Sequence, residues 1–167
     1  MLANIVISTP PTKTTYTAGQ VFDPTGMVVT ATFEDGTSKA VTGYTYEPAD
    51  ALETTDTEIT VSYGGKTATQ AVTVLSGDVS LASVTVDSVS AVKGEDDNWT
   101  VELPAGTTSV EEIEAVATDA DATITSITPD AFETVEAGQE YVSTIVVTAE
   151  DGVTTGTYTL TITVATE

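Results

Sequence analysis

Two acidic loops hold the residues best suited to chemistry. Asp96 and Asp97 share one loop with Asn98, and Asp119 and Asp121 lie two positions apart in a second stretch. Calcium takes six to eight hard oxygen ligands, which clustered loop carboxylates can supply. Neither stretch has EF-hand spacing or the Gly and Glu that complete that motif. The four aspartates are therefore the candidate metal ligands, and solvated turns are the favoured interpretation of both loops.

Most other catalytic chemistry is excluded by residue type. The chain has no His and no Cys, which removes Ser-His and Cys-His nucleophiles, thiolate metal sites and disulfides. With 26 acidic residues, carboxylate pairs of the kind used in glycoside hydrolysis exist by number alone. No pocket-forming pattern or aromatic platform accompanies them. We predict no enzyme, no catalytic residue and no cofactor, with calcium at the four aspartates as the one alternative.

The net charge of −22 limits the choice of partner. Four lysines and no arginine cannot form the basic surface that nucleic acid requires. An anionic membrane surface is disfavoured for the same reason, and no apolar run is long enough to span a bilayer. We interpret the charge as a source of solubility and like-charge repulsion.

The aromatic residues admit a structural and a functional interpretation. Trp99 shares a face with Val101 and Leu103 in an alternating run, so we predict that it fills the core. The alternative is a platform on which a sugar ring stacks. We also predict that three tyrosines are packing residues and not a binding cluster: Tyr44, Tyr46 and Tyr63.

An intramolecular isopeptide bond occurs in some surface β-sandwiches and requires a buried lysine beside a buried acid or amide. The only lysines that could donate are Lys13, Lys39, Lys66 and Lys93. All four lie in or near polar turns, so we predict no such bond.

The elements that position these residues are short strands. Thr makes up about a fifth of the chain and, with Val, favours strands through β-branching. In the first unit, residues 27–33 alternate apolar and polar, an Asp35-Gly36 turn follows, and Lys39–Tyr46 is the expected return strand. Gly64-Gly65 predicts a tight hairpin between residues 59–63 and 66–74.

A second unit follows a boundary near residues 75–78, where Leu75-Ser76-Gly77-Asp78 separates two alternating runs. Strands are predicted at 99–103, 113–117, 141–148 and 157–164, with Asp151-Gly152 joining the last two. Residues 109–115 could form a short helix, but the period of two at Ile113, Ala115 and Ala117 favours a strand. Several short strands at regular spacing indicate antiparallel β-sandwiches.

The first unit resembles a bacterial immunoglobulin-like domain of the group 3 type. The resemblance rests on Tyr16-x-x-Gly19-x-x-Phe22-Asp23, on Asp35-Gly36 and on the run Val61 to Ala68. The second unit resembles bacterial cadherin-like modules through Val147 to Gly152 and Tyr158 to Ile162. The expected fold is all-β, with two tandem immunoglobulin-like antiparallel β-sandwiches at residues 1–75 and 79–167.

The resemblance implies a non-enzymatic structural or adhesive module displayed outside the cell. One setting is a phage virion decoration or fibre-like protein, which needs no signal peptide and fits a chain whose first strand follows Met1 directly. The other is an excised segment of a bacterial cell-surface protein. The expected partner is a protein on the capsid or cell surface, basic or neutral, meeting an exposed strand edge. A carbohydrate-binding module, with a glycan as partner, is the alternative.

Overall fold

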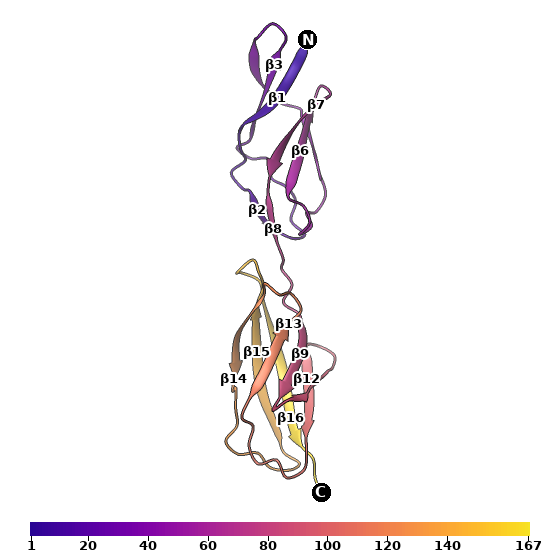
Figure 1. Ribbon diagram of the computed structural model, residues 1–167, viewed down its shortest axis with the longest axis vertical. Helices are drawn as coiled ribbons and strands as arrows, with labels where there is room; N and C mark the ends of the chain where they lie inside the picture. Colours follow the sequence, from indigo (N-terminus) through magenta and orange to yellow (C-terminus); the bar gives the residue numbers. More distant parts are fainter. The chain divides into compact units, whose positions relative to one another are not determined.

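Strands and turns account for all the regular structure of the protein. The computed structural model describes residues 1–167 and contains sixteen strands and no helix. The chain folds into two compact units, Met1–Ser76 and Gly77–Glu167 (Figure 1). The prediction of an all-β chain is confirmed.

The first unit contains eight strands. They are β1 (Leu2–Thr9), β2 (Thr15–Thr17), β3 (Val28–Phe33), β4 (Ser38–Val41), β5 (Thr45–Glu47), β6 (Glu58–Tyr63), β7 (Lys66–Ala71) and β8 (Thr73–Leu75). They form two three-stranded antiparallel sheets, in the orders β1-β3-β4 and β5-β6-β7, and a short pair, β2-β8. The Gly64-Gly65 hairpin forms as predicted, with φ of 54° and 78° between the paired residues Tyr63 and Lys66.

Alternation along β3 and β6 builds the core of the first unit. Val29 and Ala31 on β3, and Ile59 and Val61 on β6, are fully buried. Their intervening neighbours on the same strands are more exposed, as a half-buried strand requires. Each of the valine and isoleucine side chains removed from water in this way contributes about 1.5–3 kcal/mol.

The expected return strand, Lys39–Tyr46, is wrong as a single element. The structure divides it into β4, which pairs with β3, and β5, which pairs with β6 in the other sheet. Gly43 lies between them with φ of 76°, a conformation that glycine adopts without steric cost. The chain therefore passes from one sheet to the other at this point.

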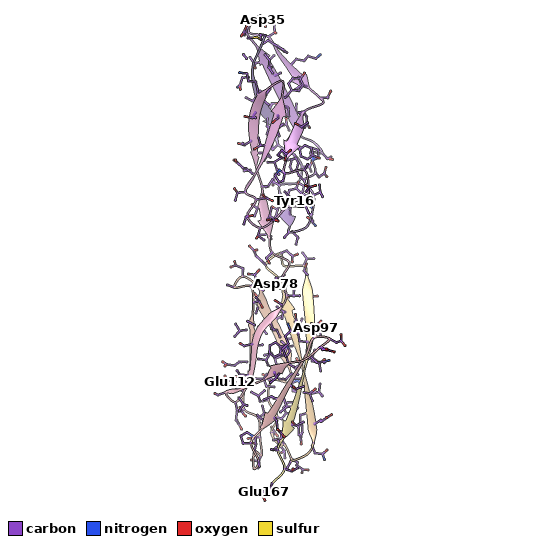
Figure 2. All side chains as sticks on the ribbon, turned by 90° about the vertical axis from the view of Figure 1, so that its right-hand side faces the viewer. Tyr16, Asp35, Asp78, Asp97, Glu112 and Glu167 are labelled. Carbon is purple, nitrogen blue, oxygen red and sulfur yellow. The ribbon has the colours of Figure 1, made fainter.

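The second unit also contains eight strands. They are β9 (Leu81–Val86), β10 (Val89–Ser90), β11 (Val92–Lys93), β12 (Asn98–Leu103), β13 (Ile113–Ala117), β14 (Thr123–Thr128), β15 (Glu140–Thr148) and β16 (Thr155–Val164). One sheet has the order β10-β9-β13 and the other β11-β12-β16-β15-β14. Asp78 lies at one end of this unit and Glu167 at the opposite end (Figure 2).

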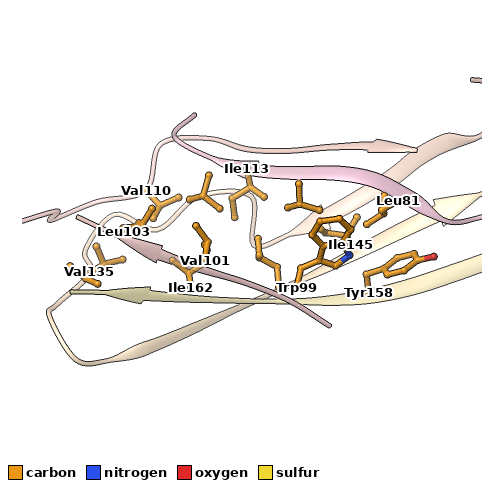
Figure 3. Close-up of a cluster of buried hydrophobic side chains, with 14 of the residues drawn as sticks. Leu81, Trp99, Val101, Leu103, Val110, Ile113, Val135, Ile145, Tyr158 and Ile162 are labelled. Atoms are coloured by element: carbon orange, nitrogen blue, oxygen red, sulfur yellow. The ribbon is translucent and has the colours of Figure 1, made fainter. Parts of the chain in front are cut away.

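The core of the second unit lies between these sheets. The larger sheet contributes Trp99, Leu103, Ile145 and Ile162, and Leu81 from β9 faces them (Figure 3). Residues 113–117 form β13, so the strand prediction is confirmed and the short-helix alternative is wrong.

A bulge in β14 explains why its two core residues, Ile124 and Ile127, lie three positions apart, although side chains along a strand alternate with a period of two. The register against β15 shifts between Ile124 and Ser126, so one extra residue is accommodated there. Ile124 and Ile127 consequently both pack against the core.

Two pairings depart from the predicted antiparallel pattern. β2 runs parallel to β8, and β12 runs parallel to β16 over six residue pairs from Asn98–Thr159 to Leu103–Val164. Strands that are neighbours in sequence pair antiparallel through hairpins, whereas these partners are distant in the chain and meet only through the tertiary fold.

Removing the Tyr16 hydroxyl tests how much its buried hydrogen bonds stabilise the first unit. This buried phenol donates to the Lys13 carbonyl at 2.9 Å and accepts from the Asp23 amide at 3.2 Å. Tyr16→Phe leaves both backbone groups without this partner, so we expect a loss of about 1–2 kcal/mol in the free energy of unfolding, measured by denaturant titration. The matched control is Tyr63→Phe in the same unit, where no such hydrogen bond is lost. An equal change in the free energy of unfolding for the two variants would show that the hydrogen bonds of the Tyr16 hydroxyl do not stabilise the unit.

Candidate functional site

The first acidic loop is a tight turn between β11 and β12. Asp96 and Asp97 both adopt positive φ, 51° and 60°, which is uncommon outside glycine. The Asp97 carbonyl accepts from the Thr159 amide at 3.2 Å, and the Gly94 amide donates to the Asn98 carbonyl at 2.8 Å. The backbone of this loop therefore fixes the approach of β12 to β16.

The second acidic stretch is a turn that follows β13. The Asp119 carboxylate accepts from the Asp121 amide at 3.0 Å, and the Asp119 carbonyl accepts from Ala122 at 3.2 Å. In neither loop do three or more His, Cys, Asp or Glu side chains converge into a group that could hold a metal ion. Calcium binding at Asp96, Asp97, Asp119 and Asp121 stays a prediction.

Carboxylates that accept hydrogen bonds from nearby backbone amides are a recurring feature that the sequence reasoning missed. The acceptors in such turns include Asp23, Asp35, Asp56, Asp78, Asp119 and Asp151. The available signal was the spacing Asp-x-Thr at 23–25 and 35–37, since an aspartate commonly bonds the amide two residues on. Much of the acidity thus shapes turns.

Asp87 makes the longest-range contact of this kind. Its Oδ1 accepts from the amides of Glu111 at 3.0 Å and Glu112 at 2.9 Å, more than twenty residues away. Asp87 and Ser88 form the turn from β9 to β10 with φ of 47° and 69°. One carboxylate therefore positions both this turn and the segment that leads into β13.

Hydrogen bonding and burial perturb three ionisable groups. Two bonds from Thr37, from its Oγ1 at 2.6 Å and its amide at 3.0 Å, lower the pKa of Asp35. Bonds from Thr25 lower the pKa of Asp23 in the same manner. Burial, followed by the negative charges of Asp97 and Asp78, raises the pKa of Tyr158. Its hydroxyl donates to the Val79 carbonyl at 2.9 Å, so these shifts reflect structural roles.

Trp99 is a core residue, as predicted. Its side chain is 4% exposed and packs in the cluster that contains Leu81, Ile145 and Tyr158 (Figure 3). The interpretation of Trp99 as a sugar-stacking platform is wrong, because no ligand can reach its ring face in the folded unit. The three predicted packing tyrosines, Tyr44, Tyr46 and Tyr63, are half-buried against the core of the first unit.

The lysines are all exposed. Lys13 Nζ donates to Gln20 Oε1 at 2.8 Å and lies 4.6 Å from the centre of the Tyr16 ring. Lys39, Lys66 and Lys93 lie on exposed positions of β4, β7 and β11. None of the four has the buried surroundings that an isopeptide bond requires.

The surface has two shallow hollows of similar volume, one in each unit. One, of about 530 Å³, lies over β12 and β16, where Glu102 and Glu140 flank Thr163 across the sheet. The other, of about 540 Å³, lies in the first unit and is bordered by Phe33 and Tyr63. Neither is lined by a buried titratable side chain. No helix long and apolar enough to cross a membrane is present.

Trp99 should be shielded from small solutes in the folded protein. We expect acrylamide, a neutral quencher that the net charge of −22 does not repel, to quench its fluorescence weakly in buffer and strongly in denaturant, because burial keeps the quencher from the indole. The matched control is Thr100→Trp, which adds an indole at the adjacent exposed position and should add a readily quenched component. Strong quenching of the native protein in buffer would place Trp99 at the surface and restore the sugar-platform interpretation.

The lowered pKa of Asp35 predicts a change in acid stability. Because folding lowers this pKa below its ordinary value of 3.8, the unfolded chain binds a proton more readily. The contribution of Asp35 to stability is present above pH 3.8 and is lost as the pH falls through the folded value. Between about pH 4 and pH 2, Asp35→Asn should therefore lose less stability than the native protein. The control is Asp50→Asn, which removes an exposed charge outside this turn. If the free energy of unfolding of Asp35→Asn fell with pH as steeply as that of the native protein, the lowered pKa of Asp35 would be contradicted.

Comparison with known proteins bears on the first unit. Residues 9–74 match the family described as bacterial Ig-like domain (group 3). No curated protein matches the chain.

Solved structures of immunoglobulin domains superpose loosely on the chain. The N-terminal four Ig domains of Dscam1 isoform 6.44 align at 10% identity and TM-score 0.24, with 95% of this chain covered. The chain spans 51% of the length of that fragment. Titin domains Z1Z2, solved in complex with telethonin, align at 11% identity and TM-score 0.23, covering 100% of this chain and 99% of theirs.

The predicted immunoglobulin-like class of the fold is confirmed. The cadherin-like resemblance of the second unit stays a prediction. Residues 9–74 of the first unit therefore match the bacterial immunoglobulin-like domains of group 3, as the resemblance predicted.

Proposed function

We propose that this chain is a non-enzymatic structural or adhesive module displayed outside the cell, on a virion or on a bacterial surface. The observation that carries the proposal is the match of residues 9–74 to the group 3 bacterial Ig-like domains. Bacterial domains of this kind are often found on extracellular or surface proteins. A structural role is also supported by the interiors of the two units, which are filled by apolar side chains and leave no internal space lined by polar groups.

The distribution of polar groups supports a role without catalysis. Ser143 is the only buried polar side chain outside the aromatic residues, and its hydroxyl donates to the Pro129 carbonyl at 2.5 Å. The carboxylates lie at the surface, many of them in turns. A reactive centre needs a perturbed group in a cleft, whereas Tyr158, the one group whose pKa burial raises, bonds a backbone carbonyl.

The charge of the chain favours a protein partner that is basic or neutral. A net charge of −22 repels nucleic acid, anionic lipid and further copies of the chain. Strands at the ends of the sheets, such as β4 and β14, pair on one side only within their sheets, so they offer backbone groups to an added strand. The burial of Trp99 argues against carbohydrate binding, because its ring is the platform on which a sugar would stack.

The location can be tested with an antibody raised against the folded chain. We expect immunogold label on intact virions or on intact, non-permeabilised cells of the source, and the labelled particle identifies the setting. An antibody against a cytoplasmic protein of the same cells serves as the control for permeability. Label that appears only after permeabilisation would overturn the proposal of an external location.

A further inference from the structure

Negative charge is divided unevenly between the two units. Residues 1–76 contain eight acidic side chains and three lysines, a net charge of −5. Residues 77–167 contain eighteen acidic side chains and one lysine, a net charge of −17. The two units are otherwise built alike, each from eight strands around an apolar core. Any effect of charge on folding should therefore differ between them.

Almost no positive charge compensates the acids of the second unit. The structure contains one ion pair, which joins the Met1 amino group to a Glu34 carboxylate oxygen at 3.7 Å in the first unit. Lys93, the only lysine of the second unit, is exposed and forms no ion pair. The acidic side chains of the second unit consequently act mainly on one another.

These acidic side chains lie at the surface, most of them in loops. Fifteen of the eighteen lie outside the strands, and none of the eighteen is buried. Charges in water interact over the Debye length, which is about 10 Å at an ionic strength of about 0.1 M and about 30 Å at about 0.01 M. Dissolved salt therefore controls how strongly the carboxylates repel one another.

Two strand acids show the distances involved. Glu102 is opposite Thr163, and Thr163 is opposite Glu140, so the three residues form one row across β12, β16 and β15. Residues directly opposite one another project from the same face of a sheet. With neighbouring strands about 4.8 Å apart, the two glutamates lie about 10 Å from each other. Dilute salt leaves their repulsion unscreened, because the Debye length then exceeds this distance.

The loop acids also act together. The negative charges of Asp97 and Asp78 both add to the effect of burial in raising the pKa of Tyr158, although the two aspartates lie in different loops. Charges from separate loops thus reach the same point of the unit. The electric field of the second unit is therefore a sum over many carboxylates and not a property of one pair.

We propose that the second unit is a salt-dependent folding unit, whose folded state is stabilised by dissolved cations that screen its carboxylates, whereas the stability of the first unit is nearly independent of salt. Self-repulsion grows with the square of the net charge, so it differs by about tenfold between charges of −17 and −5. Unfolding spreads the same charges over a larger volume and relieves the repulsion. Dilute solution therefore favours opening of the second unit, and salt restores its stability.

This inference goes beyond the proposed function, since it concerns the folding of the chain in solution and not its location. Immunogold labelling tests the location, and a folding titration of the purified chain tests the salt dependence. Failure of one experiment leaves the other interpretable.

Urea titration of the full chain can follow the two units separately. Urea is uncharged and adds no screening, unlike guanidinium chloride. Trp99 is the only tryptophan and lies in the core of the second unit, so its fluorescence follows that unit alone. Hydrogen exchange in peptides from residues 1–76, measured by mass spectrometry, follows the first unit.

The urea midpoint of the second unit should rise with salt several-fold more than that of the first. The comparison runs from about 10 mM to about 1 M NaCl, over which the Debye length falls from about 30 Å to about 3 Å. Both units share each sample, so the first unit corrects for the general effect of salt on buried apolar surface. Equal rises in the two midpoints would overturn the proposal.

Choline chloride distinguishes screening from cation binding. The quaternary ammonium of choline carries the same charge as sodium but is not a metal ion that carboxylate oxygens can coordinate. At equal ionic strength, both salts should raise the midpoint of the second unit, relative to that of the first, by similar amounts. A rise with sodium chloride alone would indicate sodium bound at particular carboxylates, and screening would then be the wrong explanation.

A charge-removing variant tests the origin of the effect. Glu102→Gln with Glu140→Gln changes the net charge of the second unit from −17 to −15, so the rise in its midpoint with salt should shrink by at least about a fifth. The matched control, Glu102→Asp with Glu140→Asp, keeps both charges on the same strands and should keep the native salt dependence. A glutamine variant whose midpoint rises with salt as much as that of the native protein would contradict the proposal.

Discussion

Burial of alternate side chains between facing sheets is the constraint on which everything else in this protein depends. Without cysteine, neither unit has a disulfide crosslink. Fully buried residues such as Val61 and Leu160 are therefore responsible for holding the strands in register. A shift of one residue would turn the apolar face outward, so the sequence specifies pairing strongly wherever alternation is strict. The loops are free to be acidic because most of the stability comes from the buried faces of the strands.

The acidity is nevertheless organised. Carboxylates accept bonds from amides within their own turns, and Asp87 extends this pattern across more than twenty residues to Glu111 and Glu112. The same atoms keep the surface negatively charged, which limits self-association at the end strands of the sheets. Acidic residues thus both form turns and keep the sheet edges of different copies apart. This explains how the chain can have so many acids although no three of them form a group that could hold a metal ion.

Local patterns predicted the parts of the fold that local physics determines. Strict alternation gave β12, β13 and β16, and Gly64-Gly65 gave its hairpin, because side-chain period and glycine conformation are readable from neighbouring residues. The passage between sheets at Gly43, the bulge after Ile124 and the parallel partners of β8 and β16 depend on residues distant in sequence, so no local pattern contains them. The turn at Asp87 and Ser88 was missed because it uses positive φ without glycine. For the candidate site, residue types were enough to locate the two loops rich in carboxylates. Only the structure shows that each loop is closed by hydrogen bonds to its own backbone.

The four lysines have a consequence for resistance to proteolysis. A protease that cuts after basic residues has only Lys13, Lys39, Lys66 and Lys93 to attack, and no such residue follows in the chain up to Glu167. Three of the four lie within strands, whose backbone must detach locally before it can enter a protease active site. Lys13, between β1 and β2, lies over the Tyr16 ring and bonds Gln20. Digestion by such enzymes is thereby limited by opening of the fold, and the last seventy or so residues would be released as one uncut piece.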